Sequence, residues 1–272
     1  MNRTVVGLAV LGLSISGLVQ AEALQIEGST TVGPIADAFA EYFKEKNPRL
    51  DITVKKTGSG DGAAALVDGR VDVATMSRFM KAEEFKKAVA NGVLPVAHAV
   101  ALDGVAIVVH PSNPVTALTT EQIRNIYMGR IRNWREVGGP SMPIVVISRD
   151  TSSGTYEVFE EKIMDNQPMH SSVEYVNANP QAHARVRSTS GAIGYVGLGF
   201  VDDEVKAVKV DGALPTRETV ASGAYTVGRP LFMFTNGYPK VGSVVHEFVS
   251  FHLSWRGQEL IEFKGFVPLT DY

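Results

Sequence analysis

The sequence predicts an α/β protein built from two domains, and three observations support this. Three short apolar or alternating stretches are each followed by a loop rich in hydroxyl groups or glycine and then by a helical pattern, as in α/β folds. The chain has 272 residues, which is long enough for two domains of medium size. Two apolar runs between residues 96 and 109 are separated by Asp103-Gly104, where we expect the chain to pass between domains through a glycine pivot.

The first strand–loop–helix unit begins with ALQIE at residues 23–27, whose alternation predicts a strand. The helical pattern that follows has Pro34 at a favoured first position and stops at Asn47-Pro48. The loop between them carries three hydroxyl side chains that are either ligands or helix caps: Ser29, Thr30 and Thr31.

The second unit runs from the predicted strand DITVKK, residues 51–56, through TGSGDG into a short helix. Ser59 offers a hydroxyl group, and the glycines around it let backbone N–H groups approach a ligand, although flexible turns look the same. The loop lacks the Lys-Ser/Thr ending of a P-loop. A further strand at residues 71–76 delivers Ser77 and Arg78 to its carboxyl end, where open α/β sheets bind their ligands.

The third unit has a buried strand at residues 144–147, the loop SRDTSSGT at residues 148–155, and an amphipathic helix. Backbone N–H groups and the positive end of the helix dipole lie at this helix start, together with the hydroxyls of Ser153 and Thr155. We place Arg149 at the entrance, as a charged donor for a small oxyanion. Capping explains one such loop equally well, but the recurrence in three loops favours an oxyanion site.

A buried strand at GRPLFMFTN, residues 228–236, returns toward the first domain, so the chain is expected to cross between the domains twice. The expected boundaries are residues 22–103 with 229–272 for the first domain and 104–228 for the second. The intervening and C-terminal helices are interpreted as structural.

Residues 1–21 have a single charge, Arg3, an apolar core shorter than the roughly 20 residues of a membrane span, and small residues before Ala21. This pattern predicts a cleaved signal peptide, with a membrane anchor as the alternative. The sequence contains no cysteine, so neither a disulfide nor an N-terminal lipid is expected. We therefore expect a freely soluble periplasmic protein.

Removal of residues 1–21 lowers the number of Lys and Arg from 26 to 25 against 29 Asp and Glu, so the formal net charge changes from −3 to −4. Without a basic excess, nucleic acid and anionic membranes are not expected as partners. The six histidines show no metal-ligand spacing, and no cofactor motif is present. Ser153 is not in a GxSxG elbow, so we expect a binding protein and not an enzyme. A phosphatase with Ser153 or Thr155 as nucleophile is the enzymatic alternative.

The order of these motifs resembles the substrate-binding proteins of bacterial phosphate ABC transporters, the PstS family. The resemblance covers the mature chain through GSTTVGP, GSGDG, VDVATMSR, LTTEQIRNIYMGRIRNW, RDTSSGT, GAIGYVGLGFV and GRPLFMF. It implies a type II periplasmic-binding-protein fold of two domains with a double-crossover hinge. The implied function is binding of inorganic phosphate by a monomer that delivers it to a membrane permease. By motif, the resemblance assigns phosphate-binding positions to Thr30, Thr31, Ser59, Ser77, Arg78, Arg149, Ser153, Gly154 and Thr155.

One position departs from the family pattern. Members of the family place an aspartate at the strand end, where it accepts a hydrogen bond from protonated phosphate, whereas this chain has Arg78, which only donates. Asp61 or Asp150 is the expected substitute acceptor. Sulfate or molybdate is therefore kept as an alternative ligand.

Overall fold

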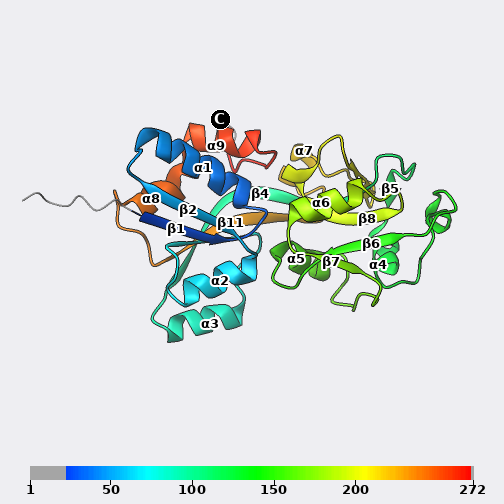
Figure 1. Ribbon diagram of the computed structural model, residues 1–272, viewed down its shortest axis with the longest axis horizontal. Coiled ribbons are helices and arrows are strands. Elements are labelled where there is room, and N and C mark those ends of the chain that lie inside the picture. Colours follow the sequence, from blue (N-terminus) through cyan, green and yellow to red (C-terminus); the bar gives the residue numbers. More distant parts are fainter. Residues whose placement is uncertain (1–22, 271–272) are drawn as a thin grey trace, which may run out of the picture.

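The computed structural model describes residues 23–270 and shows two α/β halves side by side, with strands β4 and β11 passing between them (Figure 1). Within these residues nine strands form one curled sheet in the order β2-β1-β3-β11-β4-β8-β6-β7, and β9 pairs with β4. The predicted two-domain α/β architecture is therefore confirmed.

The first half carries the N-terminal and C-terminal parts of the described chain (Figure 1). Its strands are β1 (Ala23–Gly28), β2 (Asp51–Lys56), β3 (Val73–Met76), the first part of β4 (Pro95–Val109), and β11 (Gly228–Asn236). Its helices are α1 (Gly33–Lys46), α2 (Ser59–Val67), α3 (Ala82–Ala90), α8 (Val244–Ser250), the short η3 (Phe251–Leu253) and α9 (Trp255–Phe263). The alternation in ALQIE places Leu24 and Ile26 on the buried face of β1. They pack in one core with buried side chains of α1 and α8: Ile35, Phe39 and Phe248.

The second half is built around β6 (Val145–Arg149), β7 (Glu174–Val176), β8 (Ala192–Gly197) and β9 (Lys206–Ala207). Its helices are α4 (Thr120–Tyr127), η1 (Trp134–Val137), α5 (Gly154–Lys162), α6 (Asn179–Arg187), η2 (Leu198–Phe200) and α7 (Arg217–Ala221). A separate pair of short strands, β5 (Ala117–Leu118) and β10 (Lys209–Val210), lies off the main sheet.

The parallel strands direct the predicted loops to one region. β1 pairs with β2 and β3 in parallel, so the loops after all three begin at the same edge of the sheet. In the second half β6 is parallel to β7 and β8, and its carboxyl end leads into α5. The three predicted strand–loop–helix units therefore meet where the two halves face each other.

The two apolar runs on either side of Asp103-Gly104 belong to one strand, because β4 continues through this dipeptide over 15 residues. β4 pairs with β11 from Pro95 to Gly104 and with β8 from Val105 to Val109, so the partner of the strand changes there. The Asp103 side chain accepts hydrogen bonds of 2.9 and 2.8 Å from Nε and Nη2 of Arg229 on β11.

Asp103 and Arg229 form an ion pair whose side chains are 0% and 3% exposed. Burial raises the pKa of the Asp103 carboxyl and lowers the pKa of the Arg229 guanidinium, so both groups depend on each other to remain charged. The Leu198 backbone N–H also donates to Asp103 Oδ1 over 2.8 Å. The pair thus ties together the two strands that cross between the halves.

We expect Asp103→Asn to lower the free energy of unfolding by about 3–5 kcal/mol, because it leaves the Arg229 charge buried without its partner. Urea unfolding followed by circular dichroism measures this loss. The double variant Asp103→Leu, Arg229→Met removes both charges and should lose much less stability than the single variant. Equal losses in the two variants would contradict the ion-pair explanation.

Candidate anion-binding site

The predicted loops converge on a small cavity between the two halves, which is closed so tightly that it leaves no room for a water molecule. All predicted site residues except Arg78 line it, and Gly58 joins them. The lining consists of Ser29, Thr30, Thr31, Gly58, Ser59, Ser77, Arg149, Ser153, Gly154 and Thr155. Every polar side chain in this set is buried, so the cavity gathers hydroxyl groups, backbone N–H groups and one cation away from water.

Two glycines allow the backbone of the two halves to approach closely. Gly58 has φ of +146°, and a Cβ there would lie 2.5 Å from Oγ of Ser152 in the opposite half. A Cβ on Gly154, the first residue of α5, would lie 2.5 Å from Oγ of Ser59 and 2.7 Å from Oγ of Ser77. Neither position has room for a side chain in this arrangement.

The cap and ligand interpretations of the hydroxyl residues are compatible. Ser153 is the N-cap of α5, and its Oγ accepts hydrogen bonds of 3.2 Å from the N–H groups of Thr155 and Tyr156. Ser29 Oγ likewise accepts from the N–H groups of Thr31 and Val32. Because each oxygen accepts twice, each hydroxyl hydrogen is left to donate to something else.

Side chains from both halves interact across the cavity. The hydroxyl groups of Thr31 and Thr155 lie 3.1 Å apart. Arg149 Nη2 donates to Thr30 Oγ1 over 3.2 Å. Asn179, at the start of α6, donates through Nδ2 to the hydroxyl oxygens of Thr30 and Thr31 over 3.2 and 2.9 Å. Arg229 Nη2 donates to the hydroxyl oxygen of Thr155 over 2.9 Å and to that of Thr31 over 3.3 Å.

Sequence reasoning missed Asn179 and Arg229, whereas Gly58 is one of the glycines expected to let backbone N–H groups approach a ligand. Asn179 precedes Pro180 at a helix start, and Arg229 is a charged residue that opens an otherwise apolar strand. The charge in GRPLFMF was the available signal, since a buried strand carries an arginine only where a partner neutralises it.

Arg149 was expected at the entrance, and this is wrong, because the residue is 1% exposed. It is the last residue of β6, so the neighbouring strand covers it, and its guanidinium donates to the carbonyl oxygens of Val176 and Asn177 over 3.3 and 2.7 Å. Burial lowers its pKa to about 10. Its Nη1 group is buried and makes no hydrogen bond to any residue that the structure describes. A buried cation with a free N–H group beside such a cavity suits an anion.

The chain is similar in sequence and fold to known proteins. A family model described as a PBP superfamily domain matches residues 18–256. The phosphate-binding protein PstS of Bacillus subtilis (strain 168) is 31% identical over 252 residues, which cover 91% of this chain and 81% of that protein.

The chain belongs to the PstS family.

Two solved structures share its fold. One is a candidate phosphate ABC transporter substrate-binding protein from Clostridium perfringens with bound phosphate, which has a TM-score of 0.84 and 34% identity and covers 92% of this chain and 100% of that chain. The other is an ABC-type phosphate transport receptor from Vibrio cholerae, which has a TM-score of 0.73 and 33% identity over 90% of this chain and 99% of that chain. These PstS relatives are named as binding proteins or transport receptors.

Arg78 does not line the cavity of this PstS-family chain. Its Nη1 and Nη2 groups donate to the carboxylate of Glu84 over 2.8 and 2.7 Å, and its Nε lies 2.6 Å from Oε2 of Glu157. The guanidinium therefore faces two carboxylates.

The two expected substitute acceptors also lie outside the lining. Oδ1 of Asp150 accepts from the backbone N–H and the hydroxyl group of Ser152 over 2.9 and 2.7 Å. Burial raises the pKa of Asp61, which also hydrogen-bonds Ser152. Among the residues that line the cavity, none carries a carboxylate.

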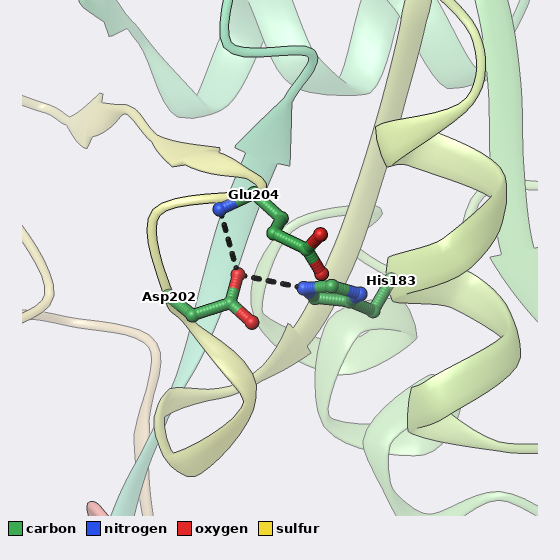
Figure 2. A group of neighbouring side chains, drawn as sticks. All are labelled: His183, Asp202 and Glu204. Atoms are coloured by element: carbon green, nitrogen blue, oxygen red, sulfur yellow. Dashed lines mark hydrogen bonds and ion pairs between the residues drawn. The ribbon is translucent and has the colours of Figure 1, made fainter.

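Away from the cavity, the fold brings together one group with metal-ligating atoms, which the histidine spacing did not predict. Figure 2 shows His183 on α6 facing Asp202 and Glu204, and the potential ligand atoms lie within 4.8 Å of one another. His183 Nε2 lies 2.8 Å from Asp202 Oδ1, and Arg187 Nη1 donates to both Glu204 oxygens over 2.7 Å. Both carboxylates are thus already paired, and we assign no metal to them.

Between residues 23 and 270, no helix combines the length and the apolar character that crossing a membrane requires. The predicted signal peptide, residues 1–21, lies outside the described residues.

We expect Arg149→Met to raise the dissociation constant for phosphate at least about 100-fold, because it removes a buried charge-assisted donor. Stability without ligand should change little, since the lost hydrogen bonds to the carbonyls of Val176 and Asn177 are offset by removal of a buried charge. Isothermal titration calorimetry and urea unfolding measure the two effects. A large loss of unliganded stability with unchanged affinity would show that Arg149 holds the fold and not an anion.

Proposed function

We propose that this protein binds inorganic phosphate in the periplasm and delivers it to the membrane permease of an ABC transporter. The observation that carries the proposal is a buried cavity between two halves whose lining offers hydroxyl groups, helix N-terminal N–H groups and a guanidinium with a free donor. The PstS relatives support the choice of phosphate and of an ABC transporter.

The proposed ligands are the lining residues of both halves. Hydrogen bonds to a charged group contribute about 1.5–3 kcal/mol each, and micromolar affinity requires about 8 kcal/mol in total. The hydroxyls of Ser29, Thr30, Ser153 and Thr155, with Arg149 and the N-terminus of α5, supply enough donors to replace the water around the anion. Arg78, which faces Glu84 and Glu157, is not among the proposed ligands.

Binding is proposed to occur by closure of the two domains, residues 22–103 with 229–272 and residues 104–228. The change of β4 partner after Gly104 supports this division. The Gly60 N–H donates to the Ser152 carbonyl over 2.9 Å, so a backbone hydrogen bond already joins the two sides of the cavity. Release to a permease would require these contacts to open. A monomer exported by a cleaved signal peptide, without a lipid anchor, completes the proposal.

The lining favours binding over catalysis. A phosphatase with Ser153 or Thr155 as nucleophile needs a base within hydrogen-bond reach. No histidine or carboxylate lines the described cavity, and Ser153 Oγ already accepts two N–H groups. We therefore propose a role without turnover.

The decisive test is calorimetric titration of the mature protein, stripped of anion, with phosphate and then with sulfate between pH 5 and 9. We expect phosphate to bind with micromolar or tighter affinity, because several donors converge on one small anion. Chromogenic phosphate esters should not be hydrolysed. Absence of phosphate binding would refute the proposal, and tighter binding of sulfate or molybdate would establish the alternative ligand.

A count of hydrogen bonds indicates which side chain can recognise a protonated phosphate. The hydroxyl oxygens of Ser29, Thr30, Thr31 and Ser153 each accept two hydrogen bonds from N–H groups, which leaves them only their hydrogen to donate. Ser59 Oγ accepts from the Ser77 N–H over 3.0 Å and lies 3.3 Å from Ser77 Oγ. If the Ser77 hydroxyl donates to Ser59, both lone pairs of Ser77 remain available to accept. We propose Ser77 as the acceptor for the P–OH group, which sulfate lacks.

We expect Ser77→Ala to weaken phosphate binding about 3- to 10-fold while sulfate affinity changes less, because one neutral acceptor contact is lost. Ser59→Ala is the matched control and should weaken both anions alike. Asp61→Asn and Asp150→Asn should leave the ratio of the two affinities unchanged, since both carboxylates face Ser152. Competition calorimetry at pH 8 measures the ratios, and a changed ratio in either aspartate variant would restore the carboxylate hypothesis.

A further inference from the structure

An ion pair joins the two proposed domains beside the cavity. Arg78 follows β3 in the first half, and Glu157 lies in the first turn of α5 in the second. Nε of Arg78 lies 2.6 Å from Oε2 of Glu157, and the two side chains are 7% and 13% exposed. Lys81 Nζ lies 3.2 Å from the other Glu157 oxygen. Arg78 and Lys81 therefore both contact a residue that lies far along the sequence, in the other half.

Arg78 is held in place by its own half of the molecule. Its Nη1 and Nη2 groups donate to the two oxygens of Glu84, and Nη1 also donates to the Phe79 carbonyl over 2.9 Å. The Nε side of the Arg78 guanidinium therefore remains available to pair with Glu157. Because the contacts to Glu84 and Phe79 do not involve the second half, Arg78 is oriented before the two halves meet.

The pair lies immediately outside the anion cavity. Ser77, which precedes Arg78, lines the cavity, and so does Gly154, three residues before Glu157. The Arg78 and Glu157 side chains are 7% and 13% exposed, whereas the Lys81 side chain is 55% exposed, so the pair itself is mostly shielded from solvent. It is therefore placed to respond to closure without touching the anion.

We propose that Arg78 and Glu157 are positioning residues that hold the two domains closed and slow the release of phosphate. This inference rests on the proposed function and assigns to Arg78 a role in closure in place of the anion-ligand role that its position in the sequence suggests.

Arg78 and Glu157 contribute unequally to the stability of the closed state. Burial raises the pKa of Glu157, and the nearby charges of Arg78 and Lys81 oppose this shift. When the domains open, Arg78 keeps Glu84, whereas Glu157 loses its contact with Arg78. Loss of Arg78 alone would therefore force Glu157 to be buried on closure with Lys81 as its remaining cationic neighbour, which disfavours the closed state. Loss of Glu157 alone leaves Arg78 paired.

This asymmetry gives a test by three variants, Arg78→Gln, Glu157→Gln and the double variant, in which phosphate release is followed by stopped-flow fluorescence. Arg78→Gln should speed release about tenfold while the association rate changes less than about twofold. Glu157→Gln should have a smaller effect. The double variant should release phosphate more slowly than Arg78→Gln, because no buried charge is left unpaired, but faster than the wild type, which keeps the ion pair.

Controls separate closure from general damage. Arg187→Gln breaks an exposed ion pair with Glu204 inside the second half and should leave release unchanged. Arg78→Lys retains a positive charge without the planar fork and should release phosphate faster than the wild type while remaining folded by circular dichroism. Should Arg78→Gln not fold, the comparison of Arg78→Met with Arg78→Met, Glu157→Gln carries the same test.

The outcomes distinguish this inference from the proposed function. If the wild type does not bind phosphate, the proposed function fails. If the wild type binds but Glu157→Gln does not rescue the Arg78 variant, Arg78 acts on the anion directly and the inference is overturned. Unchanged release in the Arg78 variants also overturns it.

Discussion

The structure depends on the buried ion pair between Asp103 and Arg229. These residues lie on β4 and β11, the strands that cross between the halves, and their carboxylate and guanidinium are 2.8 Å apart. Arg229 also donates to Thr31 in the first half and Thr155 in the second. The same guanidinium therefore holds the crossing strands together and orients a hydroxyl group on each side of the cavity. Any rotation about the crossing strands must change these contacts.

The proposed anion site is costly to the fold without its ligand. Nη1 of Arg149 and Nη1 of Arg229 are buried without a hydrogen-bond partner among the described residues. An unsatisfied buried donor is unfavourable, and a bound anion is one partner that would satisfy it. The lack of a carboxylate in the lining also leaves these donors without a partner, because a negative side chain there would accept their hydrogen bonds and neutralise the charge.

Local sequence patterns predicted the strand–loop–helix units, since alternation, N-caps and prolines act within a few residues. Together with the family resemblance, they named nine of the residues that line the cavity. Local patterns could not predict contacts between distant segments. Such contacts determine the burial of Arg149, the hydrogen bonds of Asn179 and Arg229 to the cavity, and the ion pairs of Arg78. The continuity of β4 through Asp103-Gly104 was missed for the same reason, since its partner strands β8 and β11 lie far along the chain.

The space left at Gly154 has a consequence for how such a protein can be altered. Any side chain there would meet the hydroxyl oxygens of Ser59 and Ser77 before the halves reach their present separation. Alanine is otherwise a better helix residue than glycine, so the substitution would not harm α5 itself. A single carbon atom added at this position would therefore keep the two halves from reaching their present separation. Gly154→Ala would therefore give a protein whose two halves are folded but held slightly apart. In such a variant, binding to a membrane partner could be studied separately from binding of the anion.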